Sequence, residues 1–130
     1  MKRLYGIRGA VCSENTEKSI IQGVEQLCKK VFTENMLSAD DIVSIQFTVT
    51  DDLTVMNPAA ALRKGNCGID VSQCALFCST EPEVENSLRH VIRLLVIAYM
   101  SERTSPRHIY INGAEVLRPD FSDCKHLPIK

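Results

Sequence analysis

CSTEPEVENSLRHVIRLLVIAYM, residues 78–100, is the stretch on which the fold depends. From residue 91 onward it is almost entirely apolar, which is typical of an element buried in the core. Its apolar residues recur at the spacing of an α-helix, and acidic residues precede them, as at a helix N-terminus. The predicted buried stripe consists of Val84, Leu88, Val91, Ile92, Leu95 and Tyr99. We therefore expect a second long helix here, beginning just after Glu81.

One charged residue, Arg93, interrupts the apolar run. A buried guanidinium is costly unless it is paired or hydrogen-bonded. Periodicity leaves two interpretations open: the aliphatic stem packs while the head reaches water, or the head enters a pocket and binds an anion. Arg8 poses the same choice, because it lies in a predicted strand between Gly6 and Gly9, where a ligand can approach closely.

The first half of the chain predicts a strand at residues 3–11 and an amphipathic helix at residues 16–35, with Asn15 as its N-cap. A second strand is predicted at residues 42–50, because polar and apolar residues alternate there. Its apolar face is Val43, Ile45, Phe47 and Val49, and its polar face is Ser44, Gln46, Thr48 and Thr50. That polar face meets either water or a shared interior.

The second half adds a short helix that Asn57 caps, that Pro58 begins and that Gly65 ends. A strand follows at residues 73–79, with Cys74, Leu76 and Cys78 on one face. Asn112-Gly113 predicts a hairpin between two short strands. Two long helices and about five strands predict an α+β fold with the helices on one sheet face.

Composition limits the class of protein. The chain has 130 residues, which predicts one domain, 1–130, and its polar tail from about residue 119 is expected to be flexible. A net charge of −1 gives no general attraction to nucleic acid or membrane. No apolar run is long enough to span a membrane, and no signal peptide is expected. We predict a cytoplasmic protein without nucleic-acid or membrane partners.

Cysteine and histidine give little sign of catalysis or metal binding. Six cysteines include no CxxC pair and are expected to be reduced core residues. Cys78 and Glu81 resemble a thiol with a base, but no histidine is placed to activate the thiol. The three histidines, which lack metal-like partners, are His90, His108 and His126. Arg63 ends the short helix and Arg118 precedes Pro119. Each is a candidate ligand for an anion, and the alternative interpretation is an ordinary surface arginine.

Six pieces of the sequence, in order and over almost the whole chain, resemble the trimeric, barrel-type chorismate mutases. The pieces are GIRGA (6–10), PAAALR (58–63), CSTE (78–81), IR (92–93), RHIYI (107–111) and VLRPD (116–120). The resemblance implies a ferredoxin-like α+β subunit with a mixed sheet and two long helices on one face. Three subunits would form a pseudo α/β-barrel, with active sites at the subunit interfaces.

The family's reaction is the Claisen rearrangement of chorismate to prephenate, a step toward phenylalanine and tyrosine. This rearrangement is pericyclic, so it requires no nucleophile, metal or acid–base pair, and no cofactor is predicted. Catalysis would come from holding the reactive conformer and stabilising the charge that develops as the C–O bond breaks.

The resemblance also implies a role for each matching residue. Arg93 would donate to the ether oxygen, Arg8 would bind a carboxylate, and Glu81 would accept from the ring hydroxyl. Tyr110 and Cys78 complete the predicted catalytic set. The predicted substrate-binding residues are Arg63, Leu117, Arg118 and Asn57.

Two positions depart from the family pattern: Asn57 replaces a bulky aromatic residue and Ala60 replaces a lysine. The segment KGNCGIDVSQ is also somewhat longer than usual. Asn57 and Ala60 favour one alternative, a non-catalytic or regulatory trimer that binds a small carboxylate. A second alternative is an imine-deaminase-type enzyme on a similar trimeric fold, in which an interfacial arginine also binds a carboxylate.

Overall fold

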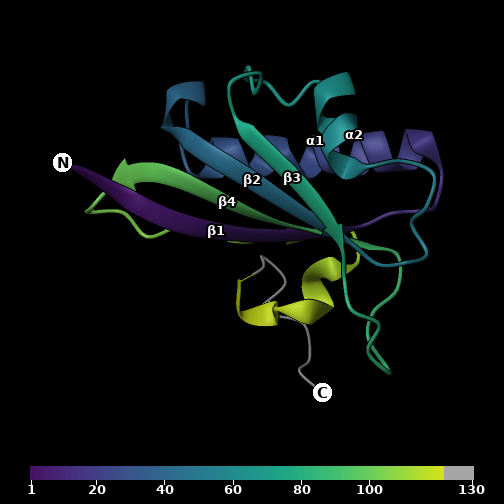
Figure 1. Cartoon of the computed structure of the whole chain (residues 1–130). Coiled ribbons are helices and arrows are strands. Elements are labelled where there is room, and N and C mark those ends of the chain that lie inside the picture. Colours follow the sequence, from purple (N-terminus) through teal and green to yellow (C-terminus); the bar gives the residue numbers. More distant parts are fainter. Residues whose placement is uncertain (122–130) are drawn as a thin grey trace.

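The structure, a computed structural model, describes residues 1–121 and is built on one five-stranded mixed sheet (Figure 1). The strand order is β3-β2-β4-β1-β5. Strand β4 pairs antiparallel with both β1 and β2, whereas β5 runs parallel to β1 and β3 runs parallel to β2. The strands are β1 (Lys2–Cys12), β2 (Ile42–Val49), β3 (Ala75–Thr80), β4 (Val91–Ser101) and β5 (Ile109–Ile111).

Helices α1 (Glu17–Glu34) and α2 (Pro58–Lys64) pack on the same side of the sheet (Figure 1). The short 3₁₀ helices η2 (Ala114–Leu117) and η3 (Pro119–Phe121), yellow-green in Figure 1, lie on the other side, and η1 (Ala39–Asp41) leads into β2. The α+β class, the mixed sheet and two α-helices on one face are thus confirmed, but of the two long helices expected only α1 is present. No helix among residues 1–121 has the length and apolar character needed to cross a membrane.

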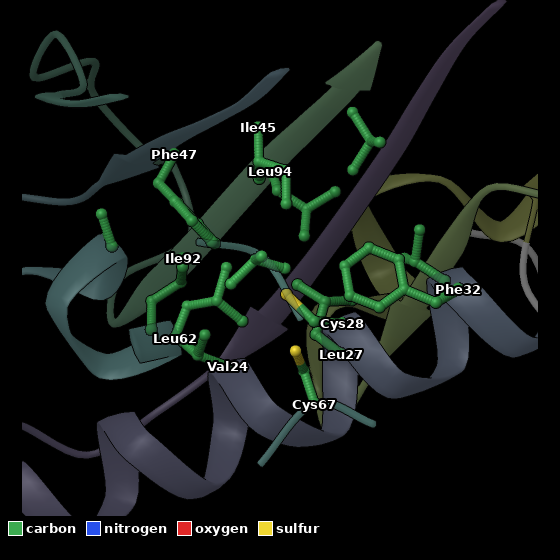
Figure 2. Packing of buried hydrophobic residues seen from close by; sticks show 14 of the residues in the cluster. Val24, Leu27, Cys28, Phe32, Ile45, Phe47, Leu62, Cys67, Ile92 and Leu94 are labelled. Atoms are coloured by element: carbon green, nitrogen blue, oxygen red, sulfur yellow. The ribbon is translucent and has the colours of Figure 1, made fainter. Parts of the chain in front are cut away.

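The hydrophobic core lies between the two helices and the sheet (Figure 2). Helix α1 contributes Val24, Leu27 and Cys28, which are fully buried, and α2 contributes Leu62. Burial raises the pKa of the Cys28 thiol far above its usual value, so this cysteine is a packing residue, as expected. The sheet residues of the core include Ile7, Val11, Ile45, Phe47, Ile92, Leu94 and Val96.

The predicted long helix through residues 84–99 is wrong. Residues 81–90 form turns and bends, and Val91–Ser101 is the central strand β4. Asn86 and His90 have φ angles of 63° and 58°, which no α-helix contains. A continuous apolar run fits a buried strand as well as a buried helix, and here pairing with β1 and β2 decides the outcome.

The predicted hairpin is half correct. Asn112 and Gly113 have φ angles of 53° and 101°, as a tight turn requires. The chain then enters η2 instead of a returning strand. Ala114 is buried against Ala10 and Val91. After this turn the chain therefore packs over the sheet as η2 and does not pair with it as a strand.

Local details also differ from expectation. Thr16, not Asn15, caps α1, and its side chain accepts a hydrogen bond from the Ser19 amide. Asn15 instead accepts from the Thr54 and Val55 amides. A bulge between Ile42 and Ser44 leaves Val43 exposed rather than on the core face. The predicted cap and ends of α2, with Asn57, Pro58 and Gly65, are confirmed.

The sheet face opposite the two helices, which we call the open face, carries the polar side of β2. Residues on it alternate with core residues along each strand. Its side chains include Arg8 on β1, Thr48 on β2 and Arg93 on β4. The unexplained polar face of β2 therefore lies beside both of the arginines that the sequence singled out.

Candidate functional site

Strand register brings Arg93 into the middle of the open face. Arg93 is paired with Ala10 on β1 and with Thr48 on β2, so it has neighbours on both sides. Arg8 is paired with Leu95, which places Arg8 diagonally from Arg93 on the same face. Two cations from adjacent strands thus point to one region of the sheet.

Glu81 is the acidic member of this group. Its amide donates to the Val49 carbonyl at 2.8 Å, which extends the pairing of β2 with β3 by one hydrogen bond beyond the last strand residue. Its carboxylate oxygen Oε2 accepts a hydrogen bond from the Thr48 hydroxyl at 2.6 Å and lies 2.9 Å from Nε of Arg93. Arg93 therefore has a protein partner, in addition to any substrate group that it binds.

The contact between Arg93 and Glu81 is an ion pair without an aligned hydrogen bond. Nε of Arg93 is buried and has no hydrogen-bond partner of suitable geometry among the described residues, although Glu81 Oε2 is 2.9 Å away. We attribute the stabilisation to charge and not to directed donation, because N–H direction decides hydrogen-bond strength. The Arg93 side chain as a whole is 42% exposed, so its remaining N–H groups are accessible.

A cavity of about 450 Å³ opens on this face between β1, β2, β4 and β5. That volume suits a small organic ligand. Three arginines line it, Arg8, Arg93 and Arg118, and its other polar groups are Gln46, Thr48 and Tyr110. This lining combines several cations with neutral donors, which is a composition that binds a small anion with more than one carboxylate.

His108 lies beside the cationic part of the cavity. Its Nδ1 accepts a hydrogen bond from the Arg8 amide at 2.9 Å, which requires an unprotonated Nδ1. Burial lowers the pKa of His108, the charges of Arg8 and Arg118 lower it further, and Asp120 opposes them. The imidazole is therefore neutral near pH 7 and adds no charge to the site.

Arg118 closes the cavity from the C-terminal side. It follows η2, and its guanidinium holds Asp120 through two hydrogen bonds, at 2.8 and 3.2 Å. This pairing raises the pKa of Arg118 and lowers that of Asp120. Leu117 packs on the small apolar cluster under η2, which includes Tyr110, a residue that is only 6% exposed.

A second, smaller cavity of about 260 Å³ lies on the other side of Arg93. It is lined by Glu81 and by the segment that leads into β4, including Arg89. Arg89 pairs with Asp51 and Asp52, which anchors this segment to the turn after β2. Arg93 lines both cavities, whereas Glu81 lines only the smaller one, so the Arg93–Glu81 pair stands between them.

Three predicted site residues lie elsewhere in the chain. Asn57 uses its side chain to cap α2, accepting from the Ala59 amide at 2.7 Å, and Arg63 is exposed in the last turn of that helix. Cys78 pairs with Phe47 in the sheet and packs against the core on the helix side, where burial raises its thiol pKa. Within one chain, none of these three lines either cavity, and neither does Leu117.

Thr48 and Gln46 line the larger cavity but were not among the residues predicted for the site. Alternation did place both on the polar face of β2, and that face was left between solvent and a shared interior. The missing information was the pairing of β2 with β4, which sets Thr48 opposite Arg93. Among the described residues, no group of three or more His, Cys, Asp or Glu side chains could hold a metal ion.

Comparisons with known proteins agree on one family. Residues 4–121 match the family model for chorismate mutase type I. The chain is 32% identical to chorismate mutase AroH of Bacillus subtilis (strain 168) over 95% of this chain and 96% of that protein. It is 34% identical to chorismate mutase AroH of Thermus thermophilus over 92% and 98% of the respective chains. A solved chorismate mutase from Clostridium thermocellum superimposes with a TM-score of 0.77 at 37% identity, covering 86% of this chain and 98% of that one.

Proposed function

Because the chain belongs to the chorismate mutase type I family, it is a chorismate mutase, an isomerase of aromatic amino acid biosynthesis, and we propose that its open-face cavity is the substrate site. The observation that carries this proposal is the arrangement of Thr48, Glu81 and Arg93 beside a cavity lined by three arginines. The substrate, chorismate, is a dicarboxylate with an enol ether and a ring hydroxyl. The open-face cavity offers arginines for the carboxylates and the ether oxygen, and Glu81, which lines the adjacent smaller cavity, offers an acceptor for the hydroxyl.

In this proposal, Arg8 binds a carboxylate with two parallel N–H groups, and Arg118 closes over the substrate with Leu117 as apolar wall. The exposed guanidinium end of Arg93 donates to the ether oxygen, where negative charge grows as the C–O bond breaks. Glu81 accepts from the ring hydroxyl across the boundary between the two cavities, and Tyr110 adds a donor near the ether. No proton moves between the enzyme and the substrate at any step.

The test is loss of chorismate absorbance together with identification of prephenate as the product. Chorismate binding without turnover would support the regulatory alternative. Turnover of an imine with no effect on chorismate would support the deaminase-type alternative.

Free thiols at all five described cysteines fit a reducing compartment, so we also propose a cytoplasmic location. We further propose that residues 1–130 form one domain.

We further propose that the protein is a homotrimer with sites at its subunit interfaces. The open face carries exposed or half-buried apolar side chains next to the cavity: Leu4, Phe77, Leu95, Ile97 and Tyr99. Phe77 is 65% exposed in the subunit, and a contiguous apolar sheet face is typical of an interface. Asn57, Arg63 and Cys78, which lie away from the cavity of their own chain, would serve the site of a neighbouring subunit.

The trimer gives the first testable prediction. Sedimentation of the purified protein is expected to show a stable trimer, and Phe77→Glu is expected to dissociate it and to remove most activity, because a charge would be buried between sheets. Met36→Glu is the matched control, since Met36 is an exposed apolar residue beyond the end of α1, away from the open face. A fully active wild-type monomer at assay concentration contradicts the proposal.

Activity is expected to change little between about pH 6 and pH 9, because arginine stays charged and no proton is transferred. His108, the titratable group beside Arg8, has a lowered pKa and is already neutral above about pH 6.5, the usual midpoint of histidine. Below that pH the unfolded chain takes up this proton more readily than the folded one. The free energy of unfolding therefore decreases as the pH is lowered. A steep bell in the pH–kcat/KM profile would indicate acid–base chemistry instead.

A further inference from the structure

We propose that Thr48 is a positioning residue for the rearrangement: its hydroxyl fixes Glu81, and Glu81 in turn fixes Arg93. This inference rests on the proposed roles of Glu81 and Arg93. Thr48 has no polar role in holding the sheet together, because its backbone serves the ladder and its side chain faces the cavity. Its hydroxyl is part of the site and not of the core.

The geometry of Glu81 separates the functions of its two carboxylate oxygens. Oε2 accepts the 2.6 Å hydrogen bond from Thr48 and also faces Nε of Arg93 at 2.9 Å. Oε1 makes no hydrogen bond or ion pair with any residue in the described part of the chain. Oε2 is therefore committed to the protein, and Oε1 is the oxygen available to a substrate hydroxyl.

Thr48 is well placed to hold that arrangement. It lies in the strand between β3, which leads into Glu81, and β4, which carries Arg93, and it pairs directly with Arg93 and with Ser79. A threonine side chain has fewer accessible χ1 rotamers than serine, because two heavy atoms branch at Cβ. Strand β2 thus fixes the Thr48 hydroxyl, and the hydroxyl in turn fixes the Glu81 carboxylate through its hydrogen bond.

Arg93 depends on this arrangement because its own hydrogen bonding is incomplete. Nε is buried and lacks an aligned partner, so the position of the guanidinium follows the charge of Glu81. If Glu81 rotates, the accessible N–H groups of Arg93 rotate with it. A misplacement of a charged donor costs catalysis even when the residue is retained, because donors act only where charge develops.

The experiment compares Thr48→Val, which keeps the shape and removes the hydroxyl, with Thr48→Ser, which keeps the hydroxyl. A hydrogen bond to a charged group predicts a fall in kcat of about ten- to hundredfold for Thr48→Val, with a smaller change in KM. Thr48→Ser should remain within a fewfold of the wild type. Thr104→Val is the matched control, because Thr104 loses a comparable bond, to the Ser101 carbonyl at 2.7 Å, beyond the far end of β4.

A double-mutant cycle with Glu81→Ala distinguishes positioning from a direct contact or a structural role. Since Thr48 acts through Glu81, Thr48→Val should cause little further loss in the Glu81→Ala background. The inference is overturned if Thr48→Val lowers kcat equally in the wild-type and Glu81→Ala backgrounds. It is also overturned if Thr48→Val retains wild-type kcat, or if Thr48→Ser loses as much kcat as Thr48→Val. If Glu81→Ala is itself fully active, the proposed role of Glu81 falls as well, so the two failures are separable.

Discussion

Arg93→Ala is expected to lower kcat by at least two to three orders of magnitude while the protein still folds. The loss of one preorganised donor to a developing oxyanion costs about hundred- to thousandfold in kcat, and Arg93 carries a full charge. Because the charge on the ether oxygen is much larger in the transition state than in the bound substrate, the effect appears in kcat and not only in KM. Steady-state kinetics with chorismate measure it.

The unfolding midpoint separates catalysis from packing in this experiment. Removing Arg93 leaves Glu81 with the Thr48 hydrogen bond but without its cation, so some loss of stability is expected as well. Arg93→Lys keeps the charge without the planar fork and should recover only part of kcat. Arg107→Ala is the matched control, because Arg107 also pairs with a glutamate, Glu34, at 3.1 Å on an exposed surface. A folded Arg93→Ala variant with kcat within a fewfold of wild type contradicts the mechanism.

Glu81→Ala is expected to lower kcat/KM by about a hundredfold or more. A substrate hydroxyl that loses a charged acceptor forfeits about 1.5–3 kcal/mol, which is roughly ten- to hundredfold, and Arg93 simultaneously loses the carboxylate that holds it. Both kcat and KM should therefore change, whereas the Arg93→Ala loss is expected mainly in kcat. Measuring the two constants separately tests this distinction.

Two further variants refine the role of Glu81. Glu81→Gln keeps an acceptor oxygen without the charge and should fall between wild type and Glu81→Ala. Glu85→Ala is the matched control, since Glu85 is exposed in the same segment between β3 and β4 and lines neither cavity. Near-wild-type kcat/KM for Glu81→Ala would show that the ring hydroxyl is bound elsewhere.

Local patterns in the sequence predicted the parts of the fold that local forces decide. Helix α1 follows from apolar residues at helical spacing, and α2 follows from a capping Asn57, an initial Pro58 and a final Gly65. The face that Cys74, Leu76 and Cys78 share also follows from alternation. That same alternation places Cys78 on the helix side and Glu81 on the open face, so the two side chains do not form the thiol–base pair that their spacing resembles.

Non-local pairing decided the stretch at residues 78–100. A run such as VIRLLVIAYM satisfies helical and strand spacing alike, so the sequence could not choose between them. Pairing with β1 along eleven residues and with β2 on the other edge makes it the central strand, and two left-handed residues before it preclude a helix. Because this stretch is a strand, Arg93 lies in the middle of the open face and not on the side of a helix.

The residues of the proposed site were predicted from the resemblance to a family. The chemistry proposed for them follows from their types: arginines for carboxylates and an acid for a hydroxyl. Their partners came only from the tertiary structure. Thr48 and Glu81 are 33 positions apart and meet at 2.6 Å because β2 pairs with β3 on one edge and with β4 on the other. Contacts across that distance in sequence are set by strand register, which depends on the burial of the whole core and not on any local pattern.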